Sequence, residues 1–509
     1  MKKKILLLAA ISFACFFQLS AKQYNINDFG AVADTAVLST QAIQKAIDAC
    51  SADGGGQVVI PAGFYQTGSI ILKSNVDFHL ENGAVLLGSK NLDDYIQLKP
   101  AYVSLRTQEA TIQLIYAENA ENIVLSGFGM IDGRGSIFPK LTWNDEGITR
   151  PHLLRFITCN HVVVKDITLK NSGCWMQHYL ACENLQINGL RIFNRNNYNN
   201  DALDLDGCRN VTVANLISDS DDDGITLKST SPKPCENISI SNCVISSRCN
   251  AIKLGTESNG GFKNINISNC VVKPSDVEAP AFFGREKGTS AIALEIVDGG
   301  TMENISVSNI VIDGTESPVF IRLGNRARPY RKDLTVDNVG KLHSISLSNI
   351  RIQNAGKTGC SITGLPGYPV HHIRLNNVVL EQAGGGKPED INAVIEEKPM
   401  EYPEATMFGT LPAYGFYIRH AADISFDGVE LAAVAEDVRP ALFLENVEKG
   451  IFSNMQLQSN KKTEATVWVK SAKDIVISGS VSKGEEAASF VKFADDNNVR
   501  ISIVNQVDK

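Results

Sequence analysis

Three aspartates, Asp201, Asp222 and Asp223, stand out as the residues of this chain best suited to acid and base chemistry. They lie in the segment 198–258, where a short pattern recurs about once every 25 residues. Carboxylates held close together repel one another, so at least one of them keeps its proton more tightly than an isolated aspartate. Such a group can donate a proton while its ionised neighbour accepts one.

The repeat consists of Asn or His, a β-branched residue or Leu, a variable residue, another apolar residue, a variable residue, and Asn, Gly or Asp. Successive copies begin about 23 to 28 residues apart, with three steps of about 40 that indicate inserted loops. The copies start near Asn122, His161, Asn184, Asn210, Asn237, Asn264, Asn304, Ser344 and His372. This spacing is typical of a solenoid.

Cysteines recur at fixed places in the repeat. One column holds Cys159, Cys182, Cys208 and Cys235, and another holds Cys243 and Cys270. Identical side chains stack when each repeat is one coil of a parallel β-helix, whose strands lie about 4.8 Å apart. A β-sandwich would also give short alternating strands, but it predicts no column of identical residues. We therefore expect an all-β parallel β-helix.

Aligning the coils on their inward apolar residues predicts which side chains become neighbours. The alignment on Leu203, Ile225, Ile252 and Ile292 places Asp201, Asp223, Asn250 and Ser290 in one column, with Asp222 beside Asp223. One outward column then holds Asp204, Thr226, Lys253 and Ala293. The next holds Asp206, Lys228, Gly255, Glu295 and Arg322.

The two ends of the chain carry different signals. Residues 1–21 combine a basic start, an apolar run and a small-residue end, which is typical of an export signal cleaved after Ala21. Lipoprotein anchoring at Cys15 is the less favoured alternative, and export predicts a periplasmic or extracellular protein. We expect one β-helix domain over residues 22–509, with the catalytic coils at about 160–330 and less regular coils at about 380–509.

A single amphipathic helix is expected before the first coil. Ser39 or Thr40 caps it, and its apolar face holds Ile43, Ala46, Ile47 and Cys50. We expect this helix to cover the open N-terminal end of the β-helix.

Composition excludes some partners. The net charge of -8, without a basic stripe, argues against nucleic acid, and no apolar run after residue 21 is long enough to span a membrane. Ten cysteines follow the signal. Because most of them occupy repeat columns, we favour buried packing thiols, while one or two disulfides remain open.

Several motifs together resemble the polygalacturonase family, family 28 of the glycoside hydrolases. They are NDFGAVAD, AIQKAIDAC, GGGQVVIPAGFY, GFGMIDGRG, RPHLLRF and NSGCWMQH, followed by the acidic cluster, and the resemblance covers about residues 24–325. It implies a right-handed parallel β-helix and inverting hydrolysis of pectic backbones. Inversion needs two carboxylates about 6.5 to 9.5 Å apart.

The resemblance carries over residue by residue to the acids. The Asn-Xaa-Asp motif matches Asn199-Asn200-Asp201 and the Asp-Asp motif matches Asp222-Asp223. Asp222 is then the expected general acid, and Asp201 with Asp223 the pair that orients and deprotonates water. No metal and no organic cofactor are required.

Two family motifs are missing. Cys249-Asn250-Ala251 stands where Gly-His-Gly is expected, and Ala293-Leu294-Glu295 where Arg-Ile-Lys is expected. Because those cations grip a sugar carboxylate in the family, either other residues do so here or the sugar differs.

We expect Lys253, with Lys228 as second candidate, to replace the lost cations. The remaining candidate substrate-binding residues are Asn199, Asn250, His178 and Arg322. The alternative is that Lys228 pairs with Asp206, Lys253 with Asp204 and Arg322 with Glu295, as ladders of ion pairs on the surface.

Two insertions flank the acids and carry aromatic and basic residues suited to binding sugars. They are residues 274–289 and 322–340, with Phe282, Phe283, Arg285, Lys287, Arg326, Arg328, Tyr330 and Arg331. Loops that wall a cleft favour cutting from a chain end.

The expected function is an exported, exo-acting hydrolase of galacturonide or rhamnogalacturonan type. The alternatives are a calcium-dependent lyase on the same fold and a noncatalytic carbohydrate-binding β-helix protein.

Overall fold

The computed structural model describes residues 22–140, 149–277, 287–484 and 487–504. The expected export signal with Cys15 lies outside these ranges, as do Phe282, Phe283 and Arg285 of the first insertion. None of the helices in the described residues is long and apolar enough to cross a membrane.

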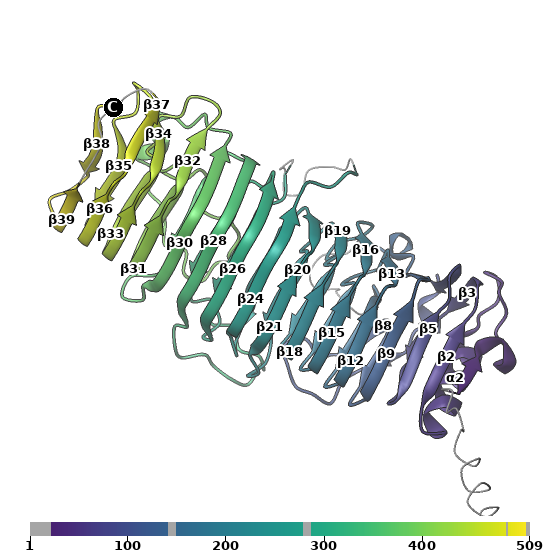
Figure 1. Ribbon diagram of the computed structural model, residues 1–509. Helices are drawn as coiled ribbons and strands as arrows, with labels where there is room; N and C mark the ends of the chain where they lie inside the picture. Colours follow the sequence, from purple (N-terminus) through teal and green to yellow (C-terminus); the bar gives the residue numbers. More distant parts are fainter. Residues whose placement is uncertain (1–21, 141–148, 278–286, 485–486, 505–509) are drawn as a thin grey trace, which may run out of the picture.

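The described chain winds into a parallel β-helix, as the repeat predicts, and its strands pair from one coil to the next along three faces (Figure 1). The first face consists of β4 (Ile70–Ile71), β8 (Thr111–Glu118), β11 (His152–Ile157), β14 (Gln177–Leu180), β17 (Leu203–Asp206), β20 (Ile225–Ser229), β23 (Asn250–Ser258), β25 (Ser290–Ile296), β27 (Val319–Leu323), β29 (Cys360–Thr363), β31 (Phe416–Asp427), β33 (Leu442–Ser453), β35 (Ala465–Lys470) and β38 (Ser489–Phe493).

The second face consists of β1 (Gln23–Asn25), β2 (Gly56–Ile60), β5 (Val76–Leu80), β9 (Glu121–Gly127), β12 (Asn160–Lys165), β15 (Glu183–Asn188), β18 (Arg209–Ala214), β21 (Cys235–Ser241), β24 (Phe262–Val272), β26 (Thr301–Asp313), β28 (Lys341–Ala355), β30 (Val370–Gln382), β36 (Lys473–Ser478) and β39 (Val499–Val504). The second halves of β31 and β33 also belong to this face.

The third face consists of β3 (Gly63–Thr67), β6 (Ala84–Gly88), β10 (Met130–Asp132), β13 (Thr168–Lys170), β16 (Arg191–Asn194), β19 (Ile217–Ser220), β22 (Val244–Ser247), β32 (Glu430–Ala433), β34 (Gln456–Ser459) and β37 (Val481–Gly484). The last residues of β24, β26, β28 and β30 turn onto it. The short strand β7 (Gln97–Leu98) pairs antiparallel with β8.

The predicted register is confirmed where it positions the acids. Leu203 pairs with Ile225, Ile225 with Ile252, and Ile252 with Ile292. All four side chains are fully buried in one continuous apolar core. Outward neighbours follow the same register, so Asp204, Thr226, Lys253 and Ala293 form one column, as expected.

The recurring Asn of the repeat forms a corner of the coil. Asn184, Asn210, Asn237, Asn264 and Asn304 all have a φ between 53° and 57°, a left-handed conformation that Asn tolerates better than most residues. Their amides also form a ladder, in which each side chain donates to the Asn of the preceding coil at 2.7 to 3.2 Å. The repeat in the sequence therefore corresponds to one Asn corner in each coil.

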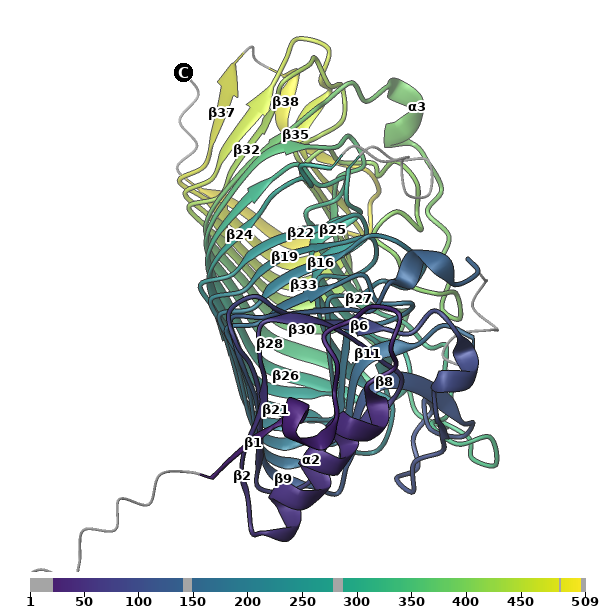
Figure 2. The same cartoon turned by 90° about the vertical axis from the view of Figure 1, so that its right-hand side faces the viewer.

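Helix α2 (Thr40–Ala52) confirms the predicted helix, with Ser39 at the N-cap position and Ile43, Ala46, Ile47 and Cys50 buried. It lies across the N-terminal end of the coils (Figure 2). The other helical segments are short: η1 (Ile26–Phe29), η2 (Leu92–Asp94), η3 (Gly135–Ile137) and α3 (Pro388–Ile391).

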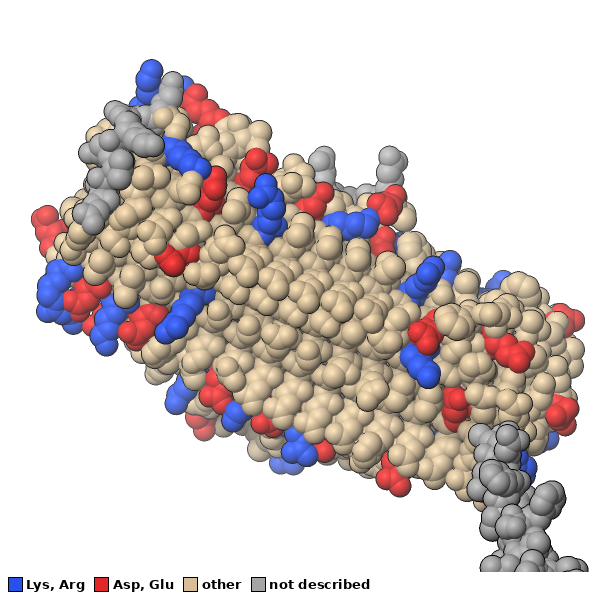
Figure 3. Space-filling model, viewed as in Figure 1, with Lys and Arg blue, Asp and Glu red and all other residues tan. Residues whose placement is uncertain are grey.

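Most of the cysteines are packing residues of the core, whereas Cys174 and Cys249 are buried outside the main apolar cluster. All ten in the described ranges are buried, and none of them forms a disulfide. The second face, seen in Figure 3, has few charged side chains over its middle, where Lys, Arg, Asp and Glu give way to other residues. The buried acidic and basic side chains that could do chemistry lie beside the first face instead.

Candidate active site

The three aspartates lie on two consecutive coils, where the chain turns from the third face onto the first. Asp201 comes just before β17, and Asp222 and Asp223 come just before β20. Backbone hydrogen bonds join the coils at this turn: the amide of Ala202 donates to the carbonyl of Asp223 at 2.9 Å, and that of Gly224 to the carbonyl of Asn250 at 2.8 Å. The β-helix therefore brings the predicted catalytic residues together.

Asp223 is held as a carboxylate. Its oxygens accept from the ammonium of Lys253 at 3.0 Å and from the side-chain amide of Asn250 at 2.9 Å. Burial alone would raise its pKa, but the charges of Lys253 and Lys228 and the hydrogen bond from Asn250 hold the pKa below its usual range.

Asp222 has the opposite tendency. Burial and the neighbouring charge of Asp223 raise its pKa to about 7, although Lys253 and Lys228 oppose the shift. Its backbone is fixed, because the hydroxyls of Ser220 and Ser247 both donate to its carbonyl, at 2.9 and 2.7 Å. Its side chain is half-buried. Two adjacent aspartates thus favour different protonation states, as an acid and a base must.

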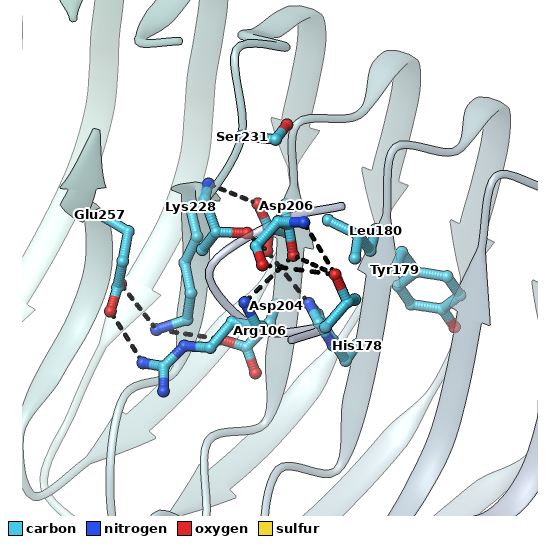
Figure 4. Close-up of polar contacts among 12 residues, drawn as sticks. Arg106, His178, Tyr179, Leu180, Asp204, Asp206, Lys228, Ser231 and Glu257 are labelled. Atoms are coloured by element: carbon cyan, nitrogen blue, oxygen red, sulfur yellow. Dashed lines mark hydrogen bonds and ion pairs between the residues drawn. The ribbon is translucent and has the colours of Figure 1, made fainter. Parts of the chain in front are cut away.

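Lys228 links Asp201 to the column beside it. Its ammonium lies 3.5 Å from Asp201, 3.3 Å from Asp204 and 4.0 Å from Glu257. Figure 4 shows Lys228 and Arg106 converging on Glu257. The alternative interpretation, in which Lys228 pairs with Asp206, is wrong, because the long side chain reaches back towards Asp201 and Asp204 instead of straight across to its register partner.

Lys253 and Arg322 also differ from the alternative interpretation, in which they form ladders of ion pairs on the surface. Both side chains are buried, with 1% of each exposed. Lys253 pairs with Asp223 and not with Asp204. Arg322 lies next to Glu295 in register, yet it donates to the carbonyls of Gly364 and Glu397 at 3.1 and 2.5 Å. Arg322 therefore fastens the chain near residue 397, and neither cation forms a surface ion pair.

The other candidate binding residues, Asn199 and Asn250, have hydrogen-bond partners within the protein. Asn199 has a φ of 53° and accepts from the guanidinium of Arg150 at 2.9 Å. Asn250 receives the hydroxyl of Ser290 at 2.6 Å while its amide donates to Asp223. That their side chains bind substrate remains a prediction.

His178 lies one coil before the acids, on β14. Its Nε2 is 3.2 Å from Asp206, and its ring lies edge-on to Trp175 at 5.0 Å. It is buried and lines a cavity described below.

Two residues of the site come from the long Gly-, Pro- and Glu-rich segment after β30. The hydroxyl of Tyr402 accepts from Lys253 at 3.2 Å, and a carboxylate oxygen of Glu404 lies 3.8 Å from the sulfur of Cys249. Sequence reasoning missed both, because this segment has no repeat phase and returns across several coils to reach the acids.

Two further loops meet beside the acids. The connections 99–110 and 324–340 touch where Gln108 donates to the carbonyl of Tyr330 at 3.1 Å. Arg106 from one loop and Arg328 from the other both bind Glu257, at 2.7 and 2.8 Å. The second loop also reaches the segment after β30, because the guanidinium of Arg326 lies 5.8 Å from the ring of Tyr402.

A metal site is conceivable from the ligand atoms alone. Atoms of Asp222, Asp223 and Cys249 lie within 4.8 Å of one another. Lys253 already pairs with Asp223, however, and burial with nearby carboxylates raises the pKa of the Cys249 thiol well above its usual range. We assign no metal to this cluster.

Comparison with known proteins agrees with the geometry. The family model "Glycosyl hydrolases family 28" matches residues 50–399. A probable polygalacturonase of Vitis vinifera is 30% identical over 219 residues, which cover 41% of this chain and 45% of that protein. An exo-poly-alpha-D-galacturonosidase of Dickeya chrysanthemi is 29% identical over 253 residues, which cover 40% and 41%. The chain thus spans less than half the length of these relatives.

Solved structures show the same fold at low sequence identity. A family 28 exopolygalacturonase of Yersinia enterocolitica matches with a TM-score of 0.64 and 20% identity, covering 81% of this chain and 76% of that one. An exopolygalacturonase of Thermotoga maritima matches with a TM-score of 0.58 and 21% identity, covering 72% and 88%. The family match extends over more than half of the chain and includes all three aspartates. The chain belongs to glycosyl hydrolases family 28.

Proposed function

We propose that this protein hydrolyses glycosidic bonds in a pectic substrate, with inversion at the anomeric carbon. The observation that carries the proposal is the placement of Asp222 and Asp223 on one turn, with their pKa values shifted in opposite directions, and of Asp201 one coil away. A family 28 scaffold with these acids is suited to cleaving a sugar–sugar bond by acid and base catalysis.

Each acid has a distinct part in the proposed reaction. Asp222, with a pKa of about 7, donates its proton to the leaving glycosidic oxygen. Asp223 and Asp201 accept hydrogen bonds from a water molecule and take its proton as its oxygen attacks the anomeric carbon. Water adds across the broken bond, and a new reducing end is released.

Exo action is part of the same proposal. The contact between the connections 99–110 and 324–340, and the segment carrying Tyr402 and Glu404, support it. These segments contact each other through Arg326 and Tyr402, and by enclosing the surface beside the acids they would leave little room for a polymer to pass through. The substrate also differs from plain polygalacturonate, since Ala293 and Glu295 stand where a carboxylate grip is expected.

The test is product analysis with homogalacturonan, rhamnogalacturonan and their oligosaccharides. We expect reducing ends without ultraviolet absorbance, unaffected by chelator, and released mainly from chain ends. Asp222→Asn should lose about 10²- to 10⁴-fold in kcat. Asp221→Asn, which alters the adjacent acid paired with Arg248 at 3.1 Å, is the matched control.

Two other results would overturn the proposal. Calcium-dependent products that absorb in the ultraviolet would indicate a lyase. Binding without any product would indicate a noncatalytic carbohydrate-binding protein.

A further inference from the structure

A cavity of about 430 Å³ opens beside the first face, on the coils that precede the catalytic acids. Strands β11 and β14 form its floor through His152, Arg155 and His178, and the connections 99–110 and 324–340 form its walls together with Trp175, which lies just before β14. Trp175 is one wall, and the ammonium of Lys228 lies between its ring, at 4.7 Å, and Asp201. The cavity is therefore a neighbour of the acids and not the site of the acids themselves.

The cavity is lined by four cations and one carboxylate. The cations are Arg106, Arg155, Arg328 and Lys332, and the carboxylate is Glu109. Glu257 lies behind the wall, where it binds both Arg106 and Arg328. The lining thus has an excess of positive charge.

Arg155 is the cation that most clearly lacks a counterion. Its side chain is buried, and its terminal nitrogens donate only to the hydroxyl of Thr111 and the carbonyl of Arg106. Its Nε has no hydrogen-bond partner, and no carboxylate in the described part of the chain forms an ion pair with it. A buried charge without a partner is costly, so this arrangement favours an anionic ligand.

Two histidines give the cavity groups that suit sugar hydroxyls. Burial lowers the pKa of His178 to about 4 and that of His152 well below its usual value, so both rings are neutral near pH 7. Because Nε2 of His178 donates to Asp206, its Nδ1 is left as an acceptor. The Nδ1 atoms of both rings have no partner in the described residues. A ligand with both hydroxyls and a carboxylate fits this lining better than a simple anion.

On the other side of the acids, the buried group without a partner is a carboxyl group and not a cation. Glu295 is fully buried, neither of its carboxyl oxygens has a partner among the described residues, and burial raises its pKa to about 8. Carboxylate recognition is therefore favoured on the Arg155 side of the cleft and disfavoured on the Glu295 side.

We propose that this cavity is the subsite for a uronate residue of the substrate, and that Arg155 and Arg328 bind its carboxylate. The inference deepens the proposed function and rests on it for the class of substrate. Arg155 supplies the buried guanidinium, Arg328 closes the carboxylate from the loop side, and the two histidines bind hydroxyls of the same sugar. The cations of this chain thus lie on the N-terminal side of the acids.

The test is direct binding of sodium D-galacturonate and of D-galactose by calorimetry, using the full chain with Asp222→Asn. The two sugars differ in the group at one carbon, a carboxylate in one and a hydroxymethyl in the other. We expect galacturonate to bind at least about tenfold more tightly, since charge-assisted hydrogen bonds are worth roughly twice neutral ones. Arg155→Gln and Arg328→Ala should each remove most of this preference.

Controls separate folding from recognition. The Arg328 side chain is partly exposed, so its removal tests the idea even if Arg155→Gln fails to fold. Arg351→Ala, an exposed change on the third face, should bind like the parent. Equal binding of both sugars, or a preference retained in Arg328→Ala, would overturn the subsite. Hydrolysis by the wild type without this preference would overturn the subsite and leave the proposed function standing. A preference for galacturonate without any hydrolysis would support the subsite and overturn the proposed function.

Discussion

At the scale of single residues, the structure gives Lys253 a more specific part than either sequence interpretation. Its ammonium binds Asp223 at 3.0 Å and donates to Tyr402 at 3.2 Å, deep below the surface. Its charge favours the ionised forms of both Asp223 and Asp222. We interpret Lys253 as a residue that positions Asp223 and tunes the two acids.

Removing that charge should move the pH profile of the enzyme. Activity requires Asp223 without its proton and Asp222 with its proton, so it rises as Asp223 ionises and falls as pH passes about 7. In Lys253→Met both pKa values increase, and we expect both limbs of the kcat/KM profile to shift upward by about one pH unit or more. Lys263→Met, an exposed lysine paired with Glu303, is the control. A raised KM with unchanged limbs would instead support a direct grip on substrate.

At the scale of elements, the Asn corner converts a sequence pattern into a stack of coils. Asn237 is exposed, has a φ of 57°, and both donates to Asn210 and accepts from Asn264. Ala at this position would adopt the left-handed conformation at a cost of about 1 to 2 kcal/mol and would break the ladder. We expect Asn237→Ala to lower the denaturant midpoint, and Asn237→Gly to lower it less.

The matched control for this prediction is Ser239→Ala on the same strand. Ser239 is also exposed, but it lies in an extended strand outside the ladder, so its change should stay within about 0.5 kcal/mol. Equal losses for Asn237→Ala and Ser239→Ala would mean that the corner contributes little.

The same corners explain how much the sequence could predict. Each coil carries its own Asn and inward apolar residues, so aligning Leu203, Ile225 and Ile252 was enough to obtain the register and the crowding of Asp201 and Asp223. The pairing of charged side chains was harder to predict from the sequence. Lysine side chains are long enough to choose between several carboxylates in adjacent columns, and the choice depends on burial as well as register.

At the scale of the whole molecule, loops from distant parts of the chain complete the site. Arg106, Arg328 and Tyr402 meet around coils whose strands lie between them in sequence. None of these loops repeats, so no periodic signal indicates where they fold. The β-helix can be predicted from the sequence because its contacts join neighbouring coils and repeat with a fixed period. The surroundings of the acids depend on loop contacts that join distant segments and do not repeat.

The stacked cysteines give a prediction for the whole molecule. Neighbouring members of a column lie on adjacent parallel strands, about 4.8 Å apart, a spacing within the range that disulfides bridge. All ten are nevertheless buried without forming a disulfide, and burial raises the pKa of the thiols of Cys182 and Cys235 well above their usual value. The pKa values of the Cys159 and Cys270 thiols are lowered by hydrogen bonds within their columns, but all ten thiols are buried out of reach of a reagent, so these cysteines should be inert in the folded protein.

We therefore expect a thiol reagent to label almost none of the ten cysteines in the native chain 22–509 and all ten after denaturation in guanidinium chloride. A reductant should leave the thermal midpoint unchanged, because core packing and not cross-linking holds the coils together. The free cysteine count in denaturant is the deciding measurement. Eight reactive thiols, with a midpoint lowered by reductant, would show that one column pair oxidises to a disulfide and that the cross-link contributes to stability.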